Sequence, residues 1–152
     1  MGPRPYYSRE AGGWISSPGK NYTVIPPPGL PDSDPKLRRV AESYLGVPYL
    51  FGGQSRDGMD CSGFVRQVFS EAKSVELPHN ASAMSHFGRE VSKGDLEPGD
   101  LLFFKGLIFI DHTGIYMGNG YFIHCQSGVG VNYTRLDALY FAAHFAGAKR
   151  VI

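Results

Sequence analysis

The sequence has little cysteine, no long apolar run and no excess of charge of either sign. Its two cysteines are too few for a disulfide framework or a zinc knuckle. Fifteen lysines and arginines face 14 aspartates and glutamates, for a net charge of +1, so nothing in the balance indicates nucleic acid or an anionic membrane as a partner. No apolar run approaches the roughly 18 residues that a membrane-spanning helix needs. These absences indicate a globular chain without a membrane span.

Proline is unevenly distributed, and its distribution divides the chain. Eight of the 11 prolines lie within the first 35 residues. Pro26-Pro27-Pro28 removes three consecutive backbone donors and favours polyproline II, so no helix or central strand is expected to cross it. We expect residues 1–33 to form an extended leader, either a tether or an arm packed against the domain, and 34–152 to form one domain. The leader lacks a basic residue followed by an apolar segment, so no export signal is expected in it.

Helix signals dominate the first half of the domain. Asp34 and Pro35 are suited to the N-cap and first position of a helix that must end before Pro48. Asp60 is the candidate N-cap of a second helix, and Asn80 that of a short third one. The second helix has an apolar stripe at helical spacing, made by Phe64, Val65, Val68 and Phe69.

Strand signals dominate the second half. Buried strands are predicted at residues 101–104, 114–117 and 121–125, with a fourth at 129–133, and the tail should form a short helix and a strand ending at Val151. Helices followed by an antiparallel sheet make an α+β domain.

Cys61 directly follows the predicted cap of the second helix. The positive end of the helix and its free N–H groups favour a thiolate there, and the same N–H groups could hold an oxyanion. A small buried structural cysteine explains the position alone equally well.

A nucleophilic cysteine needs a base, and His112 and His124 are candidates on either side of the turn Gly118-Asn119-Gly120. A three-residue loop would place Met117 opposite Tyr121 and the two histidines on one sheet face, about 7–8 Å apart. A two- or four-residue loop would place them on opposite faces. The remaining histidines are His79, His86 and His144.

Several ordered motifs resemble those of the NlpC-type cell-wall cysteine peptidases, a papain-like family. Met59 to Val65 is similar to the nucleophile motif of that family, and Tyr49 to Gly53 is similar to its upstream Tyr-x-Trp-Gly-Gly signature. The resemblance extends over about residues 35–152 through Leu77-Pro78, Pro98-Gly99-Asp100-Leu101, the segment from His112 to Tyr116, Gly118-Asn119-Gly120 and Ile123-His124. It implies an α+β fold with the nucleophile at a helix start, packed on an antiparallel sheet.

The resemblance also implies roles. Cys61 matches the nucleophile, His112 the base and His124 the polar third residue that orients the base. Residues of the oxyanion or substrate-binding side are expected to be Tyr49, Asp60 and Ser62. No metal and no cofactor are implied. The expected reaction is hydrolysis of an amide in the peptidoglycan stem peptide, usually between γ-D-glutamate and a diamino acid, by a monomer in the cell envelope or secreted.

The sequence departs from the family near the expected cleft. Phe51 stands where Trp is usual, and His79, Asn80 and Met84 stand where Arg, Ser or Thr, and Gln are common. The exact bond therefore stays open. His79 and His86 could contact the substrate, but we expect them to be solvated helix histidines, and Asp111 to be a solvated loop carboxylate. Cys125 is expected to be a core residue that faces away from the His124 side of its strand.

Three alternatives remain on the sequence alone. The same three residues could serve an amidase, a deamidase or another acyl-transfer enzyme with a non-wall substrate. The domain could be a binding module without activity. Cys61 and two histidines could bind zinc, although a cysteine at a helix start is better explained as a nucleophile.

Overall fold

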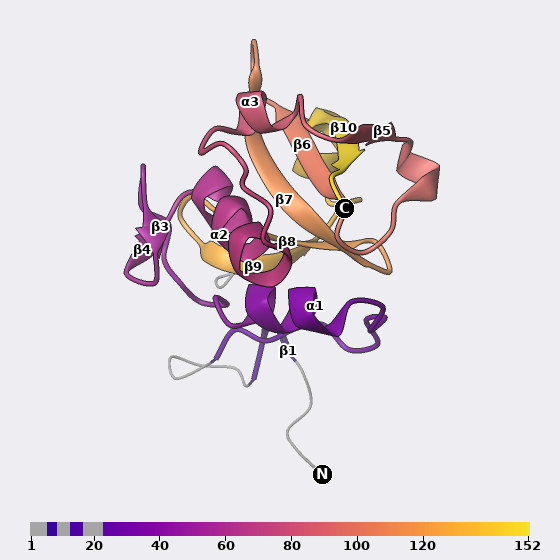
Figure 1. The fold of residues 1–152 in the computed structure, drawn as a ribbon. Coiled ribbons are helices and arrows are strands. Elements are labelled where there is room, and N and C mark those ends of the chain that lie inside the picture. Colours follow the sequence, from indigo (N-terminus) through magenta and orange to yellow (C-terminus); the bar gives the residue numbers. More distant parts are fainter. Residues whose placement is uncertain (1–5, 9–12, 17–22) are drawn as a thin grey trace.

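The computed structural model describes residues 6–8, 13–16 and 23–152. Its main feature is a six-stranded antiparallel sheet in the order β5-β10-β6-β7-β8-β9 (Figure 1). The strands are β5 (Arg89–Val91), β6 (Leu101–Lys105), β7 (Ile110–Gly118), β8 (Tyr121–Gln126), β9 (Gly130–Arg135) and β10 (Phe145–Arg150). Helices precede most of this sheet in the chain, so the predicted α+β class is confirmed.

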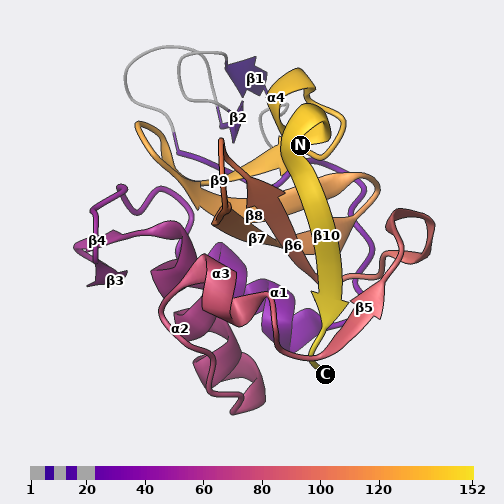
Figure 2. The ribbon, with the colours of Figure 1, turned by 90° about the horizontal axis from the view of Figure 1, so that it is seen from above.

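The helices lie on the two faces of the sheet. α1 (Pro35–Glu42) and α2 (Cys61–Lys73) cover one face, α4 (Leu139–His144) lies on the other, and α3 (Ala81–Met84) contacts both β7 and α2 (Figure 2). The three predicted caps are confirmed: the side chains of Asp34, Asp60 and Asn80 accept hydrogen bonds from the backbone of α1, α2 and α3 respectively.

Alternation along the strands sorts the apolar side chains into two cores. The face toward α1 and α2 carries the larger core, which includes Phe64, Phe69 and Ile115. The opposite face carries a smaller core with Phe104, Phe122 and Phe141. The strands β6 and β8 between the two cores are therefore buried on both sides, which explains their nearly continuous apolar sequences.

Short elements escaped the sequence analysis. They are β1 (Tyr6–Ser8), β2 (Gly13–Ile15), β3 (Gln54–Ser55), β4 (Gly58–Met59), β5 and the 3-10 turn at Lys93–Asp95. Each has two or three residues, too few for a periodic pattern to emerge.

The turn between β7 and β8 differs from the expected one, but its consequence is the same. Gly118 pairs with Tyr121, so the loop has two residues, Asn119 and Gly120, both with positive φ. A register shift between Tyr116 and Gly118 restores the expected pairing further along, where Ile115 lies opposite Ile123. The β-bulge, rather than a three-residue loop, sets the register in which the histidine positions follow.

The described part of the leader contacts the domain. β2 lies against β9, Ile15 is buried, and the side chain of Asn119 donates a hydrogen bond to the carbonyl of Gly29 (2.6 Å). These contacts concern only the described parts of the leader. The choice between a tether and a packed arm for residues 1–33, and the expected lack of an export signal, also involve residues 1–5, 9–12 and 17–22, which lie outside the described residues.

Candidate active site

Cys61 is the first residue of α2, and Asp60 holds this helix start in place. The Asp60 carboxylate accepts from the backbone N–H of Gly63 (2.7 Å) and of Gly52 (3.1 Å). A Cβ at Gly63 would lie 2.2 Å from the carbonyl oxygen of Gly53, so only glycine lets the two segments approach this closely. The two sequence motifs around Tyr49 and Cys61 are thereby joined into one structure.

A cleft of about 480 Å³ opens at this helix start. Tyr49, Asp60, Cys61 and Ser62 all line it, so the structure brings together four of the six predicted site residues. The rest of its lining consists of Phe51, Gly52, His79, Asn80, Ala81, Ser82, Phe109, Ile110 and Asp111.

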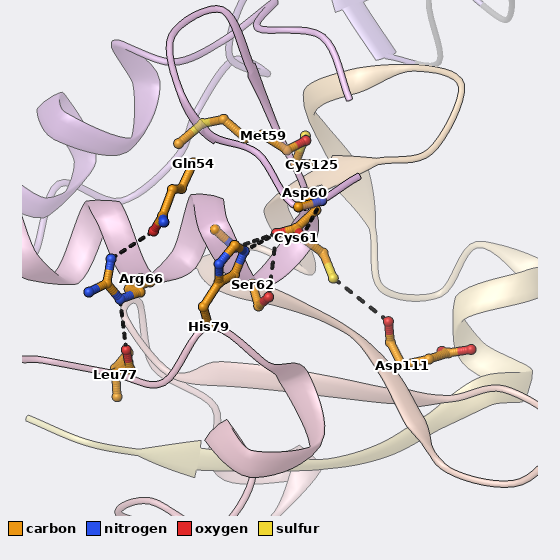
Figure 3. A network of polar contacts seen from close by, with 12 residues as sticks. Gln54, Met59, Asp60, Cys61, Ser62, Arg66, Leu77, His79, Asp111 and Cys125 are labelled. Carbon is orange, nitrogen blue, oxygen red and sulfur yellow. Dashed lines mark hydrogen bonds and ion pairs between the residues drawn. The ribbon is translucent and has the colours of Figure 1, made fainter. Parts of the chain in front are cut away.

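The sulfur of Cys61 lies against the start of β7, next to His112. Its Sγ donates to the carbonyl oxygen of Asp111 at 3.7 Å (Figure 3). The backbone N–H of Thr113, on the other side of His112 in the chain, also bonds to the sulfur. Both residues that flank His112 thus contact the sulfur through their backbones. Although the structure describes both side chains, it shows no hydrogen bond between Sγ and the His112 ring.

Burial raises the pKa of the Cys61 thiol to about 11. The charge of Asp60 adds to this rise, whereas the N–H groups of Thr113, Ser62 and Cys61 itself oppose it. The N–H groups of the helix start thus favour the thiolate, as expected, but desolvation of the sulfur outweighs them in the free protein. Cys61 rests as a neutral thiol.

His112 and His124 lie on one face of the sheet, as expected, and bond directly. Nε2 of His112 is 2.7 Å from Nδ1 of His124, and Nε2 of His124 is 2.8 Å from Oγ1 of Thr134. The Thr134 hydroxyl in turn donates to Oδ1 of Asn132 (2.8 Å), whose amide nitrogen donates to the carbonyl of Gly130 (2.9 Å).

This chain of hydrogen bonds assigns the protons of both rings. The Thr134 hydroxyl donates its only proton to Asn132, so in its bond to His124 it must accept. His124 therefore carries its proton on Nε2. Nδ1 of His124 is then an acceptor, and His112 donates to it from Nε2. His112 is left with an unprotonated Nδ1, which is the nitrogen a general base needs.

Burial also keeps both rings neutral. It lowers the pKa of His112 to about 4 and that of His124 well below its ordinary value. The rings of Phe104 and Phe141 lie within 6.0 Å of the His112 ring, centroid to centroid, and supply the apolar surroundings. At neutral pH the site holds a neutral thiol beside a neutral imidazole.

Two groups of residues were missed by sequence reasoning. Asn132 and Thr134 complete the chain of hydrogen bonds from β9; their alternation with Val131 and Tyr133 was the available signal. His79 was expected to be a solvated helix histidine, but it precedes α3, lines the cleft and bonds to Asp60 at 2.7 Å. That expectation is wrong, because tertiary packing brings residue 79 beside the start of α2.

Cys125 lies on the other side of its strand from His124. It is fully buried in the larger core, and its Sγ donates to the carbonyl oxygen of Met59 at 3.1 Å. Both cysteines are free thiols. The predicted orientation of Cys125 toward the core is confirmed.

Within the part of the chain that the structure describes, no group of three or more His, Cys, Asp and Glu side chains is arranged to hold a metal ion. Among those same residues, no helix is both long enough and apolar enough to cross a bilayer.

Known proteins resemble this chain in sequence. The sequence model of the NlpC/P60 family matches residues 46–150. The probable endopeptidase NlpC of Escherichia coli K12 is 35% identical over 144 residues, which cover 88% of this chain and 91% of that protein. The murein DD-endopeptidase MepS/murein LD-carboxypeptidase of the same strain is 35% identical over 117 residues, or 75% of this chain and 62% of its own. The gamma-DL-glutamyl hydrolase of Bacillus subtilis is 36% identical over 121 residues, or 78% and 29%.

Solved structures resemble it in fold. An NlpC/P60 family protein from Bacillus cereus superposes with a TM-score of 0.73 at 25% identity, covering 91% of this chain and 53% of that one. The NlpC/p60 domain of the peptidoglycan hydrolase SagA gives 0.68 at 28% identity, covering 76% and 96%. The chain thus spans some of these proteins almost fully and others by well under two thirds of their length.

Proposed function

Because the chain belongs to the NlpC/P60 family, we propose that it is a cysteine endopeptidase that hydrolyses an amide bond in the stem peptide of peptidoglycan. The resemblance to NlpC-type peptidases is confirmed by the family match and by relatives named endopeptidases. The papain-like α+β fold agrees with the solved family structures. The type of reaction rests on the site, and the peptidoglycan substrate rests on the relatives named murein and peptidoglycan hydrolases.

One observation carries the proposal. A chain of hydrogen bonds runs from Asn132 through Thr134 and His124 to His112, and it ends at an unprotonated Nδ1. The backbone on both sides of His112 contacts the sulfur of Cys61 at the cleft. A base with a fixed lone pair next to a thiol in a cleft is the arrangement that nucleophilic acyl transfer requires.

The proposed first half-reaction starts from the neutral pair. The Cys61 proton passes to Nδ1 of His112 as the sulfur attacks the scissile carbonyl carbon, and the carbonyl oxygen becomes an oxyanion. We propose that the backbone N–H groups at the start of α2 donate to that oxyanion. When the intermediate collapses, the C–N bond breaks and His112 gives its proton to the leaving amine. A thioester on Cys61 remains.

Water completes the second half-reaction. His112 removes a proton from the attacking water, the tetrahedral intermediate collapses, and the carbon–sulfur bond breaks. The carboxylic acid leaves and the thiolate takes the proton back from His112. His124 acts throughout as the orienting group, and as a neutral acceptor it stabilises the imidazolium that forms.

Tyr49 is proposed to support the oxyanion side. It lines the cleft, and burial together with the nearby cysteine and Asp60 groups raises the pKa of its phenol. The O–H therefore stays protonated and available as a donor. Ser62 is buried at the same cleft, with its hydroxyl 3.4 Å from the Asp60 carboxylate.

The bond that we propose is the one between γ-D-glutamate and a diamino acid. The gamma-DL-glutamyl hydrolase among the relatives supports a γ-glutamyl bond, whereas the murein relative is named for two other bonds. The substrate puts the proposed site of action in the cell envelope or outside the cell, and we propose that the protein acts as a monomer.

Digestion of purified sacculi tests this function. Wild-type protein should release stem-peptide fragments with a new free amine on the diamino acid, identified by mass spectrometry, and Cys61→Ala should release none. Ammonia without new fragments would indicate a deamidase instead. Sacculi left unchanged by a correctly folded wild type would reject the proposal.

A further inference from the structure

His79 and Asp60 form a pair directly beside the nucleophilic position. Nε2 of His79 is 2.7 Å from Oδ1 of Asp60, and the side chains are 26% and 15% exposed (Figure 3). A carboxylate can only accept, so the proton of this bond belongs to His79. The His79 imidazole thus donates to the carboxylate of Asp60, the residue directly before Cys61.

The segment that carries His79 is held firmly. Leu77 is buried in the larger core, and its carbonyl accepts from Nε of Arg66 on α2 at 3.1 Å. Asn80 begins α3 immediately after it. His79 is therefore fixed from both sides at the wall of the cleft, and its position does not depend on the bond to Asp60 alone.

Asp60 stabilises the start of α2, but its carboxylate also places a negative charge next to Cys61. Its carboxylate caps α2 and also binds the N–H of Gly52. The same negative charge opposes ionisation of the neighbouring thiol and of Tyr49. A cysteine nucleophile must carry negative charge as it attacks, so an uncompensated carboxylate at this place would raise the barrier.

Little else in the cleft offsets that charge. Among the described residues that line it, His79 alone can carry a positive charge, and the other acidic group, Asp111, is exposed on the start of β7. Arg66 is engaged elsewhere, with Leu77, with Gln54 (2.7 Å) and with Glu76 (3.8 Å).

We propose that His79 is a positioning residue that compensates the charge of Asp60, so that Asp60 can cap the helix without suppressing the reactivity of Cys61. This inference rests on the proposed function, because it takes Cys61 as the nucleophile. The sequence motif did not predict this role, because Arg is common in the family at the position of His79.

The experiment measures alkylation of Cys61 by iodoacetamide from pH 6 to pH 10, with the labelled peptide separated from that of Cys125 by mass spectrometry. In His79→Ala the pH profile should move upward, and labelling at pH 8 should slow by about threefold to tenfold, the effect of a pKa rise of half a unit to one unit. His79→Gln retains an N–H donor and should label faster than His79→Ala.

The double variant Asp60→Asn/His79→Ala decides the cause. Asparagine has one acceptor oxygen, which keeps the cap of α2 but gives up the bond to Gly52, and it carries no charge, so labelling should return to the wild-type rate or exceed it. His86→Ala, an exposed histidine outside the cleft, is the matched control and should leave the profile unchanged. Thermal melts show whether every variant is folded.

Two results would overturn the inference: a His79→Ala profile equal to that of the wild type, or a double variant as slow as His79→Ala. Labelling needs no peptidoglycan, so the outcome is separate from that of the sacculi digestion. Sacculi that stay intact while the labelling behaves as expected would reject the substrate and leave the role of His79 standing.

Discussion

The two faces of the central sheet are buried in different ways. The face beneath α1 and α2 holds the larger core, whose burial is almost entirely of apolar groups such as Leu37, Phe64 and Phe69. The opposite face buries aromatic rings together with His124 and Asn132, both of which are fully enclosed. The first face supplies hydrophobic stabilisation. On the second face, apolar side chains surround the hydrogen-bonded side chains of His112, His124, Thr134 and Asn132.

The second face can contain buried polar groups because they are hydrogen-bonded to one another. An unpartnered buried imidazole or amide would cost about 1–3 kcal/mol, but here each group from His112 to Asn132 has a partner. Since every donor is matched with one acceptor, the same bonds that offset burial also direct the proton of each ring. We expect changes on the first face to affect stability and changes on the second to affect chemistry.

The largest effect is expected at the two reacting groups, His112 at the end of the chain of hydrogen bonds and Cys61 next to it. Cys61→Ala and His112→Ala should each lower hydrolysis of wall peptides by at least about 1000-fold, because each removes a reacting group. His124→Ala should cost less, since it only orients the base. Rates of fragment release from sacculi measure this.

Cys125→Ala is the control for that series, because Cys125 is a buried thiol on the opposite side of its strand. It should keep most of the activity. If it were as inactive as Cys61→Ala, the assignment of the nucleophile would be wrong.

A core change should produce the reverse outcome. Phe69→Ala empties a fully buried site in the larger core, two turns along α2 from Cys61, and should lower the free energy of unfolding by about 3–5 kcal/mol. Urea denaturation measures the loss. At a low temperature where the variant is folded, kcat should stay near that of the wild type; a large loss of kcat would mean that the two faces are not separable.

Thr134 offers a finer test of the polar face. Thr134→Val keeps the shape but removes the hydroxyl that fixes the His124 proton, so kcat should fall by about tenfold, the scale of one orienting hydrogen bond. Thr134→Ser should retain most of the activity. Nitrogen-15 NMR of the histidine rings should show a single His124 tautomer, protonated at Nε2, in the wild type and a mixture in Thr134→Val; an unchanged tautomer in that variant would contradict the proton assignment.

The smallest expected effect concerns pH and stability. Burial lowers the pKa of His112 from its ordinary value of 6.5 to about 4 in the folded state. Between pH 6.5 and pH 4, His112 is therefore protonated in the unfolded chain but neutral in the folded chain. The stability from these neutral rings is complete above pH 6.5 and should be lost as the pH falls toward 4.

Melting temperatures at pH 7, 5.5 and 4.5 measure this loss, and His86→Ala should show the same decline because that ring is exposed. A melting temperature that stayed constant or rose on acidification would show that the rings are charged in the folded state.

The sequence predicted well what depends on neighbouring residues. The caps Asp34, Asp60 and Asn80 act over three residues, so their side chains are readable from the local sequence. The strands β6 to β9 were placed for the same reason, because their apolar runs are bounded mainly by glycine and proline. The resemblance to the family drew on the same contiguous motifs.

What failed depends on distant contacts. The turn after β7 has two residues and a β-bulge, a combination decided by how β7 packs and pairs along its whole length. The neutral thiol at Cys61 results from burial that a cap motif alone does not show. His79 reaches Asp60 only because Leu77 is anchored in the core.

By itself, the sequence determined the longer helices and strands, the α+β class and the helix start at Cys61, since each of these follows from local conformation and strand period. The β-bulge in β7 decided that His112 and His124 share one face of the sheet. The tertiary structure alone decided which nitrogen of His112 is free, whether the thiol is ionised and which residues surround Asp60. Those properties depend on desolvation and on hydrogen bonds between strands and loops far apart in the chain, and they exist only once the two faces of the sheet are buried.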